Sequence, residues 1–561
     1  MGLLLMALTV VVYVPSMYGG FIWDDDAHLT ENPCVVGPQG LKEIWTTAAA
    51  RICPLTLSCF WLQHAIWGLN PFPYHLVNIV MHACSAILLW RILLRLDVPG
   101  AWFAALLWAV HPVQVESVAW ITELKNTQSC LFYMLTILFF LKWMNAVAKG
   151  SPKREWMYTI SIVFAVLAMF SKSSTVILPV VLGLCAYWVN GGWRWSYTWR
   201  LVPFFALAAL TSALSMWTQQ LEGAGDPQWT RTIAERLITA GNVVWFYLGT
   251  LLWPQPLTFI YPKWEVKAAI ASSYIGFVAA CSLLLFLCWK RHGRLRPLFF
   301  AYSYFVVALL PVMGLVNHFF LRYSFVGDHF QYIASAGFIA MVTGVVARMS
   351  QLGGQSGRRA GICIGCSVSV LLGVLTWRYE GVFADHDQAR LWRDTLSKNN
   401  TAWLAHNNLG VLLVAQGNHA EGKKHYEECL RFNPNFAQAH NNLAVTLSAQ
   451  ENHAEAIVHS AEALRLEPNY AEAHYNFGNA LLHQQQLAEA IGHYMEALRL
   501  NPNYSEAHNN LGNAFAMLGN YTESIVHFKE AFRLNPNNVN AQNNTRIIQE
   551  AIQARDISKS P

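Results

Sequence analysis

The chain has 561 residues, of which 54% are hydrophobic and 13% are charged, and its formal net charge at pH 7 is +5. So few charges in so long a chain exclude a single soluble globular protein, and the composition is typical of a membrane protein with a soluble part attached. The small net charge, without a basic stripe interleaved with aromatic residues, excludes a nucleic-acid-binding protein. We therefore expect the lipid bilayer as a partner and no nucleic acid.

Apolar segments that could span a membrane recur before residue 378, and we expect about eleven spans. Several are shorter than the roughly 20 residues that a spanning helix prefers, so neighbouring helices must bury their ends. A further apolar run, 237–253, is followed by two prolines, which end a helix. If it crossed the bilayer, the basic cluster 290–296 would lie outside, so we predict a re-entrant or interfacial segment. The predicted spans are 2–19, 73–94, 100–114, 127–144, 156–171, 174–190, 201–217, 269–289, 298–316, 330–347 and 361–377.

Lysine and arginine residues are concentrated in alternate connections between the predicted spans, for example at 142–154 and 290–296. Because basic connections remain in the cytoplasm, the first loop, 20–71, and everything after residue 378 are predicted to lie on the extracytoplasmic side. An error of one span would place the C-terminal part in the cytoplasm instead.

Three adjacent carboxylates, Asp24, Asp25 and Asp26, follow the first apolar segment directly. Charge this close to the bilayer is costly and is usually retained for a task. Adjacent carboxylates repel one another, so at least one is expected to have a raised pKa or to share a cation. This pattern indicates a general base or a divalent-cation site, with Mg²⁺ or Mn²⁺ at Asp24 and Asp25. The alternative is that an aspartate only marks the lipid boundary or caps the next helix.

Further polar residues are predicted to reach the same side of the membrane from distant parts of the chain. Glu116 lies in the connection after the third span, Lys172 between two later spans, and Asp328-His329 with Tyr332 at the start of the tenth. Each alone could be an interfacial residue. Their convergence with the three aspartates favours a site for an anionic, lipid-carried substrate.

A 34-residue repeat occupies the polar C-terminal part of the chain. The segment 405–410 recurs at 439–444, 473–478 and 507–512, and a proline recurs at the same interval. This period, with small residues at helix contacts, is the signature of tetratricopeptide repeats and predicts an α-solenoid. The predicted domains are a multi-span membrane domain over 1–380, a connecting half-repeat over 381–402, four repeats over 403–538, and a capping helix and tail over 539–561.

An asparagine holds the same place in the first helix of each repeat unit. This position lines the concave groove, where an amide could bond an extended peptide of a protein partner. The alternative is a structural role within the repeats. The last of these positions lies within the glycosylation triplet 543–545, and a glycan there would block the groove, which favours a bacterial inner membrane over the endoplasmic reticulum. The five residues are Asn408, Asn442, Asn476, Asn510 and Asn544.

A string of short motifs between residues 20 and 340 resembles the transmembrane-and-tetratricopeptide-repeat-containing proteins and their bacterial relatives, which belong with the type C glycosyltransferases. Two positions depart from the family pattern, because Cys53 and His329 stand where the family tends to have arginine, with Arg51 two residues before Cys53. The motifs are Trp23-Asp24-Asp25-Asp26 with Asn32-Pro33, Cys53-Pro54-Leu55-Thr56, Trp67-Gly68-Leu69-Asn70-Pro71 with Tyr74-His75-Leu76-Val77-Asn78, His111-Pro112 with Glu116-Ser117-Val118, Ser171-Lys172, and Asp328-His329-Phe330-Gln331-Tyr332.

The resemblance implies an all-α membrane bundle that transfers a mannose-like hexose from a polyprenyl-phosphate donor to Ser or Thr of a protein on the extracytoplasmic side. The repeats would bind the acceptor or a partner. Hydroxyl attack on an anomeric carbon needs a carboxylate base, here Asp25 or Asp24, and a single base without a covalent intermediate implies inversion. Glu116 would orient the acceptor or a cation. The donor phosphate would be held by cationic and polar groups, namely Lys172, Arg322, His329, Tyr332 and Arg51.

Two other functions are consistent with parts of the sequence. A lipid-diphosphate-dependent oligosaccharyltransferase or ligase would more naturally use arginine-rich outer loops, whereas the outer side here is acidic. A non-catalytic membrane-anchored scaffold would explain the repeats but leave the three aspartates without a role. A transporter is disfavoured, because no pair of Gly- or Pro-broken spans occurs in matching halves.

Overall fold

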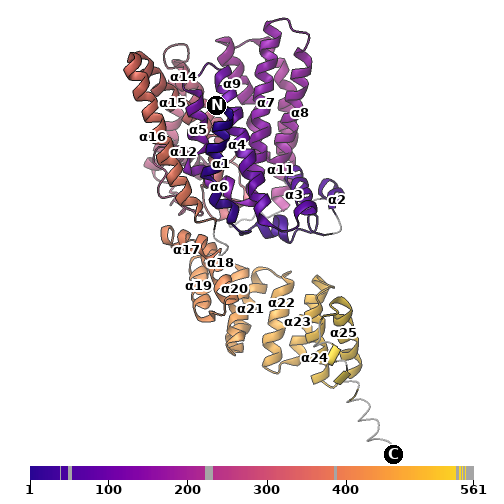
Figure 1. The fold of residues 1–561 in the computed structure, drawn as a ribbon. Helices are drawn as coiled ribbons and strands as arrows, with labels where there is room; N and C mark the ends of the chain where they lie inside the picture. Colours follow the sequence, from indigo (N-terminus) through magenta and orange to yellow (C-terminus); the bar gives the residue numbers. More distant parts are fainter. Residues whose placement is uncertain are drawn as a thin grey trace, which may run out of the picture. The chain divides into compact units, whose positions relative to one another are not determined.

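The computed structural model describes residues 1–37, 40–47, 53–221, 231–384, 388–537, 542–544, 546–547 and 550. Every regular element in these residues is a helix, which confirms the all-α prediction, and the chain divides into two compact units, Met1–Asn399 and Asn400–Pro561. The helices of the first unit, drawn in Figure 1, are α1 Gly2–Val12, α2 Gly40–Thr46, α3 Pro54–Trp67, α4 Pro71–Arg95, α5 Ala101–Ala109, α6 Val115–Ala119, α7 Leu124–Ala148, α8 Arg154–Ser171, α9 Leu178–Asn190, α10 Trp195–Thr198, α11 Val202–Leu221, α12 Ile233–Leu252, α13 Ile275–Trp289, α14 Arg296–Leu309, α15 Ser335–Leu352, α16 Gly354–Glu380 and α17 Ala389–Lys398.

Each of the predicted spans overlaps one of these helices. Among the described residues, eight stretches are long and apolar enough to cross a membrane, so the protein is a multi-pass membrane protein. The helices α1, α5 and α14, with 11, 9 and 14 residues, are shorter. The helix α5 ends early because Pro112 disfavours a helical backbone at the residue before it, where ψ is 133°. The eight stretches are Pro71–Arg95, Ile121–Ala148, Arg154–Ser171, Ser173–Asn190, Trp195–Thr218, Ala271–Trp289, Ser335–Leu352 and Gly354–Glu380.

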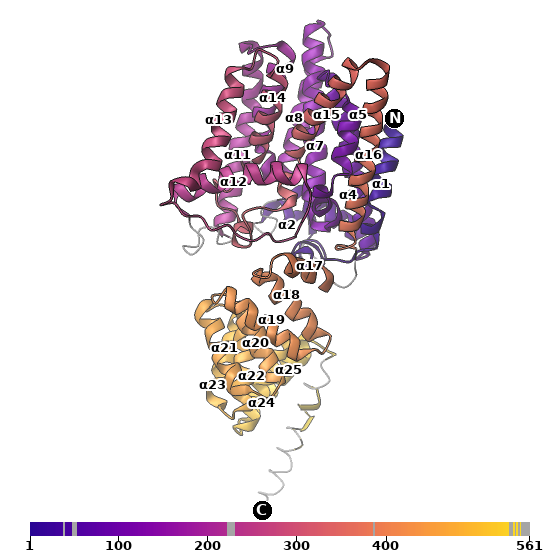
Figure 2. The ribbon, with the colours of Figure 1, turned by 90° about the vertical axis from the view of Figure 1, so that its left-hand side faces the viewer.

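The helix α12 corresponds to the apolar run that we predicted to be re-entrant or interfacial. It begins with a capping box, in which Thr232 and Glu235 satisfy each other's backbone N–H groups. A Cβ at Gly241 would lie 2.2 Å from the backbone nitrogen of Phe277, so only glycine permits this approach to the start of α13. Figure 2 shows α12 running across α13 rather than alongside it. The crossing is consistent with an interfacial helix, and its depth in a membrane stays a prediction.

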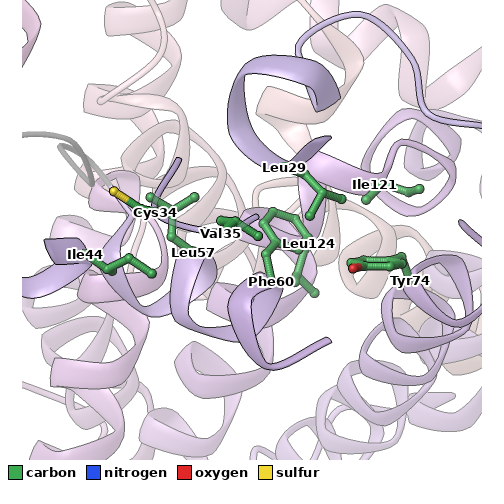
Figure 3. Packing of buried hydrophobic residues seen from close by; sticks show 9 residues of the cluster. All are labelled: Leu29, Cys34, Val35, Ile44, Leu57, Phe60, Tyr74, Ile121 and Leu124. Atoms are coloured by element: carbon green, nitrogen blue, oxygen red, sulfur yellow. The ribbon is translucent and has the colours of Figure 1, made fainter. Parts of the chain in front are cut away.

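The first loop is a folded part of the first unit. Nine side chains, each at most 5% exposed, pack α2, α3 and the segment before them against α4 and the start of α7 (Figure 3). Burial of each large apolar side chain stabilises such packing by about 1.5–3 kcal/mol. The three aspartates are therefore attached to a rigid support. The cluster comprises Leu29, Cys34, Val35, Ile44, Leu57, Phe60, Tyr74, Ile121 and Leu124.

The helix α17, which we predicted to be a connecting half-repeat, belongs to the first unit. Gln388 Nε2 donates to the carbonyl of Phe21 at 2.8 Å, and Asn399 Nδ2 donates to the carbonyl of Ile260 at 3.0 Å. The buried Trp392 contacts Trp23 and Phe259. The boundary between the units thus follows α17 rather than preceding it.

The second unit contains the four predicted helix pairs. The first helix of a pair carries a small residue at its contact with the second. A Cβ at Gly410, Gly478 or Gly512 would lie within 2.8 Å of an aromatic ring of the partner helix. Of the predicted capping helix and tail, only 542–544, 546–547 and 550 lie within the described residues. The pairs are α18 Trp403–Ala415 with α19 His419–Phe432, α20 Ala437–Ala449 with α21 His453–Leu466, α22 Ala471–His483 with α23 Leu487–Leu500, and α24 Ser505–Met517 with α25 Tyr521–Leu534.

Candidate functional site

Polar side chains from four segments meet at one end of the first unit. The segments are the loop 20–30, the short helices and turns over 112–126 that lead into α7, the junction after α8 at Lys172, and the 3₁₀ turn Asp328–Gln331. Local chemistry explains the irregular backbone here. Pro112 stops α5, and Trp23 adopts a φ of 45°, which is uncommon for a residue other than glycine.

The middle aspartate of the three, Asp25, is completely buried. Its carboxylate accepts hydrogen bonds from the backbone N–H groups of Ile22 at 2.7 Å and Thr122 at 2.8 Å. Burial raises the pKa of Asp25 to about 8, with a contribution from the charge of Asp24, although the two backbone bonds oppose the shift. The geometry makes Asp25 the group that joins the loop 20–30 to the segment 112–126.

The two flanking aspartates differ in their surroundings. The Asp24 side chain is 26% exposed, with Oδ1 3.4 Å from the Thr122 hydroxyl and Oδ2 3.8 Å from His28 Nδ1. Asp26 is exposed and accepts a hydrogen bond from Thr30 at 2.8 Å. The part of the chain that the structure describes contains no group of three or more His, Cys, Asp or Glu side chains that could hold a metal ion. Asp24 is therefore the carboxylate that is both held at the cluster and accessible.

A buried ion cluster lies beside the aspartates. Glu123, with a side chain 1% exposed, is 2.9 Å from Lys125 Nζ and 3.5 Å from Lys172 Nζ. Burial lowers the pKa of Lys172, and the charge of Lys125 adds to this, while Glu123 opposes it. Lys125 also interacts electrostatically with Asp24 and Cys53 and lies over the ring of Trp120. Two cations thus share one buried carboxylate.

Asn126 holds this cluster together. Its Oδ1 accepts from Lys172 Nζ at 2.5 Å, and its Nδ2 contacts Glu123, the Ser117 hydroxyl at 3.0 Å and the carbonyl of His329 at 3.1 Å. One amide side chain therefore links α7, the junction after α8 and the turn Asp328–Gln331.

Glu116 and His329 form a buried pair next to this cluster. The Glu116 carboxylate accepts from the backbone N–H of His329 at 3.1 Å and lies 2.8 Å from its Nδ1. The neighbouring Asp328 accepts from Tyr261 at 3.1 Å. Burial, and then the charge of Glu116, raise the pKa of Asp328 well above its ordinary value. Asp328 accordingly retains a proton more readily than an exposed aspartate does.

Aromatic rings surround the accessible carboxylate. Trp23 stacks on Trp120 with ring centres 5.4 Å apart, and its other neighbours are Phe259, Tyr323 and Trp392. Burial raises the pKa of Tyr323 to about 12; the charge of Arg322 lowers this pKa and the charge of Asp24 raises it. Both charges therefore lie near this hydroxyl. The Arg322 guanidinium lies over the ring of Phe319, 4.6 Å from its centre. Arg322 is thus on the Asp24 side of the cluster.

One predicted phosphate-binding residue, Tyr332, is not brought to the cluster. The Tyr332 hydroxyl lies 2.6 Å from His82 Nδ1, and its carbonyl accepts from Trp108 Nε1 at 3.2 Å, so this side chain faces the interior of the bundle. Arg51 lies outside the described residues.

The asparagines of the repeats form bonds between neighbouring repeats. Asn442 Nδ2 donates to Asn407 at 3.1 Å, and Asn476 Nδ2 donates to Asn441 at 2.9 Å. Asn510 and Asn544 donate in the same direction, to Asn479 at 2.8 Å and to Asn513 at 3.1 Å. Asn408 accepts from Asn407 at 3.0 Å. These contacts support the structural role that the sequence left open, and peptide binding by the asparagines stays a prediction.

Each repeat also contains a pair of histidines in contact. Their Nδ1 atoms are 2.9 Å apart in the first pair and 3.0 Å apart in the others. In three pairs the Nε2 atom of the first histidine lies 3.0–3.1 Å from a backbone carbonyl, so this nitrogen carries the hydrogen. Its Nδ1 then accepts a hydrogen bond from the Nδ1–H of the partner histidine. This bond requires the first histidine to be neutral. The pairs are His406–His425, His440–His459, His474–His493 and His508–His527.

We expect acidification to loosen the repeats. Burial, and then the partner histidine, lower the pKa values of His459, His493 and His527. The unfolded chain therefore binds more protons than the folded chain as pH falls below about 6.5, so this contribution to stability is present above that pH and lost below it. Hydrogen exchange of the full-length protein, corrected for its intrinsic pH dependence, should show less protection in 403–534 at pH 5.5 than at pH 7.5.

The matched variant for this experiment is His459→Asn, whose amide places a donor near the original Nδ1–H. It should reduce the pH dependence of exchange in α20 and α21 while leaving that of α24 and α25 unchanged. Equal protection of the wild-type repeats at the two pH values would contradict the prediction.

Comparison with known proteins finds repeat models that match the second unit and relatives that align with larger parts of the chain. Models of the tetratricopeptide repeat match residues 403–436, 425–458, 461–492, 478–519 and 505–538, which confirms the repeats. Protein O-mannosyl-transferase Tmtc1 of Drosophila melanogaster is 25% identical over 340 residues, 51% of this chain and 37% of the relative. Protein O-mannosyl-transferase TMTC1 of Homo sapiens is 23% identical over 503 residues, 77% of this chain and 55% of the relative. Protein O-mannosyl-transferase F38B6.6 of Caenorhabditis elegans is 22% identical over 468 residues, 78% of this chain and 63% of the relative.

The chain is thus similar to the TMTC proteins, at 22% to 25% identity in these three comparisons. It spans between 37% and 63% of the length of these three TMTC relatives. Among solved structures, the repeats resemble YrrB, described as a tetratricopeptide-repeat protein with an unusual peptide-binding site, at 22% identity and a TM-score of 0.26 over 28% of this chain and 81% of that one.

Both positions at which the chain departs from the TMTC pattern lie at the cluster. Cys53 interacts electrostatically with Lys125 and Lys172, and His329 is bound to Glu116. The residues that hold the cluster, Glu123, Lys125 and Asn126, lie in the connection after the third predicted span, and we assigned them no role from the sequence. The signal for their role was present, because two charges and an amide directly precede a long apolar helix.

Proposed function

We propose that the protein is a membrane glycosyltransferase that moves a mannose-like hexose from a polyprenyl phosphate to Ser or Thr of an acceptor protein on the extracytoplasmic side. The observation that carries the proposal is a partly exposed carboxylate, Asp24, beside two lysines that share the single buried carboxylate of Glu123. The names of the relatives, protein O-mannosyl-transferases, support the same reaction class.

The reaction needs a base and a cation on opposite sides of the anomeric carbon. Asp24 accepts the proton of the acceptor hydroxyl, whose oxygen forms the new bond to the anomeric carbon. The bond from that carbon to the donor oxygen breaks, and its electron pair leaves with the polyprenyl phosphate. Lys172, with Lys125 behind it, stabilises the phosphate charge. With one base and no covalent intermediate, the anomeric configuration inverts.

The remaining groups position this pair and limit water. Asp25 fixes the loop that carries Asp24 through two backbone bonds. Glu116 holds the turn Asp328–Gln331 through His329. The rings of Trp23 and Trp120 lower the local dielectric, which strengthens the attraction between a cation and the departing phosphate. The repeats, on the same side of the membrane, would bind the acceptor protein.

The test is transfer of radiolabelled mannose from polyprenyl-phosphate mannose to protein or peptide acceptors by the purified full-length protein in lipid. We expect turnover by the wild type and a loss of about 10²-fold or more in Lys172→Met, because the cation acts where charge develops. Lys267→Met, which removes an exposed lysine paired with Glu265, is the control and should retain activity.

The second candidate function is a non-catalytic scaffold, which is favoured by one observation. His329 stands at a position where the family tends to have arginine, and its imidazole is already bound to Glu116. The scaffold predicts no release of sugar from any polyprenyl-phosphate donor while peptides still bind to the repeats. That result would overturn the transferase proposal.

A further inference from the structure

A cavity of about 950 Å³ lies between helices at the end of the first unit away from the acidic cluster. It is lined by the last turns of α4, the middle of α7 and most of α15, whereas the cluster adjoins the first turns of α7 and the segment before α15. Figure 1 shows these two ends of the long helices well apart. The cavity therefore has no part in the proposed transfer site.

The walls and the rim of the cavity differ in chemistry. The walls are formed by aliphatic and aromatic side chains, including Leu89, Ile137, Val181 and Phe300. At the rim are three arginines, Arg294, Arg296 and Arg348, and a single carboxylate, Asp97. Among the described residues, none of these three arginines forms an ion pair. The rim thus carries an excess of positive charge above an apolar interior.

Arg296 is held at this rim in a fixed position. Its guanidinium lies 4.7 Å from the centre of the Trp188 ring and donates to the carbonyl of Trp188. Its Nε is shielded from solvent and has no hydrogen-bond partner within the described part of the chain. A shielded donor on a cation is costly to leave unsatisfied, which indicates that an acceptor approaches from the cavity side.

We propose that the cavity holds one acyl chain of an anionic membrane phospholipid whose phosphate binds Arg294, Arg296 and Arg348. Guanidinium groups match phosphate oxygens in geometry and charge, and an apolar cavity of this size suits a lipid chain better than water. The predicted orientation places this basic rim at the cytoplasmic leaflet, where anionic lipids bind basic pockets between spanning helices. The occupant is thus a structural lipid of the bilayer rather than the sugar donor.

The experiment is native mass spectrometry of the full-length protein in detergent with added dioleoylphosphatidylglycerol, dioleoylphosphatidylcholine or a polyprenyl phosphate. We expect one tightly bound phosphatidylglycerol, and weaker binding of phosphatidylcholine. Arg294→Gln combined with Arg348→Gln removes two exposed cations without disturbing the core and should weaken phosphatidylglycerol binding by about fivefold for each arginine. Arg358→Gln combined with Arg359→Gln changes the charge equally at exposed positions of α16 outside the cavity and should leave binding unchanged.

Three outcomes would overturn the proposal. They are equal binding of the two phospholipids, equal weakening in the two double variants, and preference for a polyprenyl phosphate over phosphatidylglycerol. The last would make the cavity a binding site for the donor lipid. Because the experiment measures lipid binding and not sugar transfer, its result does not depend on the transferase proposal.

Discussion

Replacement of Asp24 by Asn is expected to reduce sugar transfer by about 10²- to 10⁴-fold, the range for loss of a general base. Asn keeps the volume and the acceptor oxygen that faces Thr122 but cannot take up the proton of the acceptor hydroxyl. The side chain is partly exposed, so folding should not change. The measurement is the initial rate of mannose transfer at saturating donor, with the thermal midpoint recorded for the same preparation.

The neighbouring aspartates provide matched controls for this variant. Asp26→Asn alters an exposed side chain that accepts a hydrogen bond from Thr30, and this variant should retain transfer. Asp25→Asn should lower both transfer and the thermal midpoint, because an amide cannot accept from Ile22 and Thr122 with both of its polar atoms. Equal activity of the Asp24→Asn and wild-type proteins would exclude Asp24 as the base.

The helices and the repeats could be predicted from the sequence because they depend on local patterns. Apolar runs bounded by basic connections define the long helices, and a 34-residue period defines the helix pairs. The sequence of α17 suits a half-repeat, whereas its Trp392 packs against Trp23 and Phe259 of the membrane unit. Such a contact joins residues far apart in the chain, and no local pattern reports it.

The convergence of acidic and basic residues at one end could also be predicted, but the role of each residue could not. Three consecutive aspartates look equivalent in sequence. Trp23 has a left-handed backbone, and the backbone N–H of Thr122 donates to Asp25. Together these two features bury Asp25 and leave Asp24 accessible. Tyr332 follows His329 by three residues, yet its hydroxyl faces His82 inside the bundle because a 3₁₀ turn precedes α15. These orientations depend on tertiary contacts.

Replacement of Glu123 by Gln is expected to lower the free energy of unfolding by about 3–5 kcal/mol, the usual effect of breaking a buried ion pair. Glu123 is the carboxylate that lies within ion-pair distance of both Lys125 and Lys172, and its side chain is 1% exposed. Without it, two partly buried cations repel each other where water screens their charges poorly. The measurement is thermal unfolding of the purified protein in lipid, followed by tryptophan fluorescence.

Two further variants separate the loss of charge from the loss of shape. Glu265→Gln breaks an exposed pair with Lys267 at 2.9 Å and should change stability by less than about 1 kcal/mol. Adding Lys125→Met to Glu123→Gln removes one of the two uncompensated cations, so the double variant should be more stable than Glu123→Gln alone. If adding Lys125→Met instead lowered the stability of the protein further, the loss of stability in Glu123→Gln would come from lost packing around Glu123 rather than from unpaired charge. The two lysines would then not depend on this carboxylate.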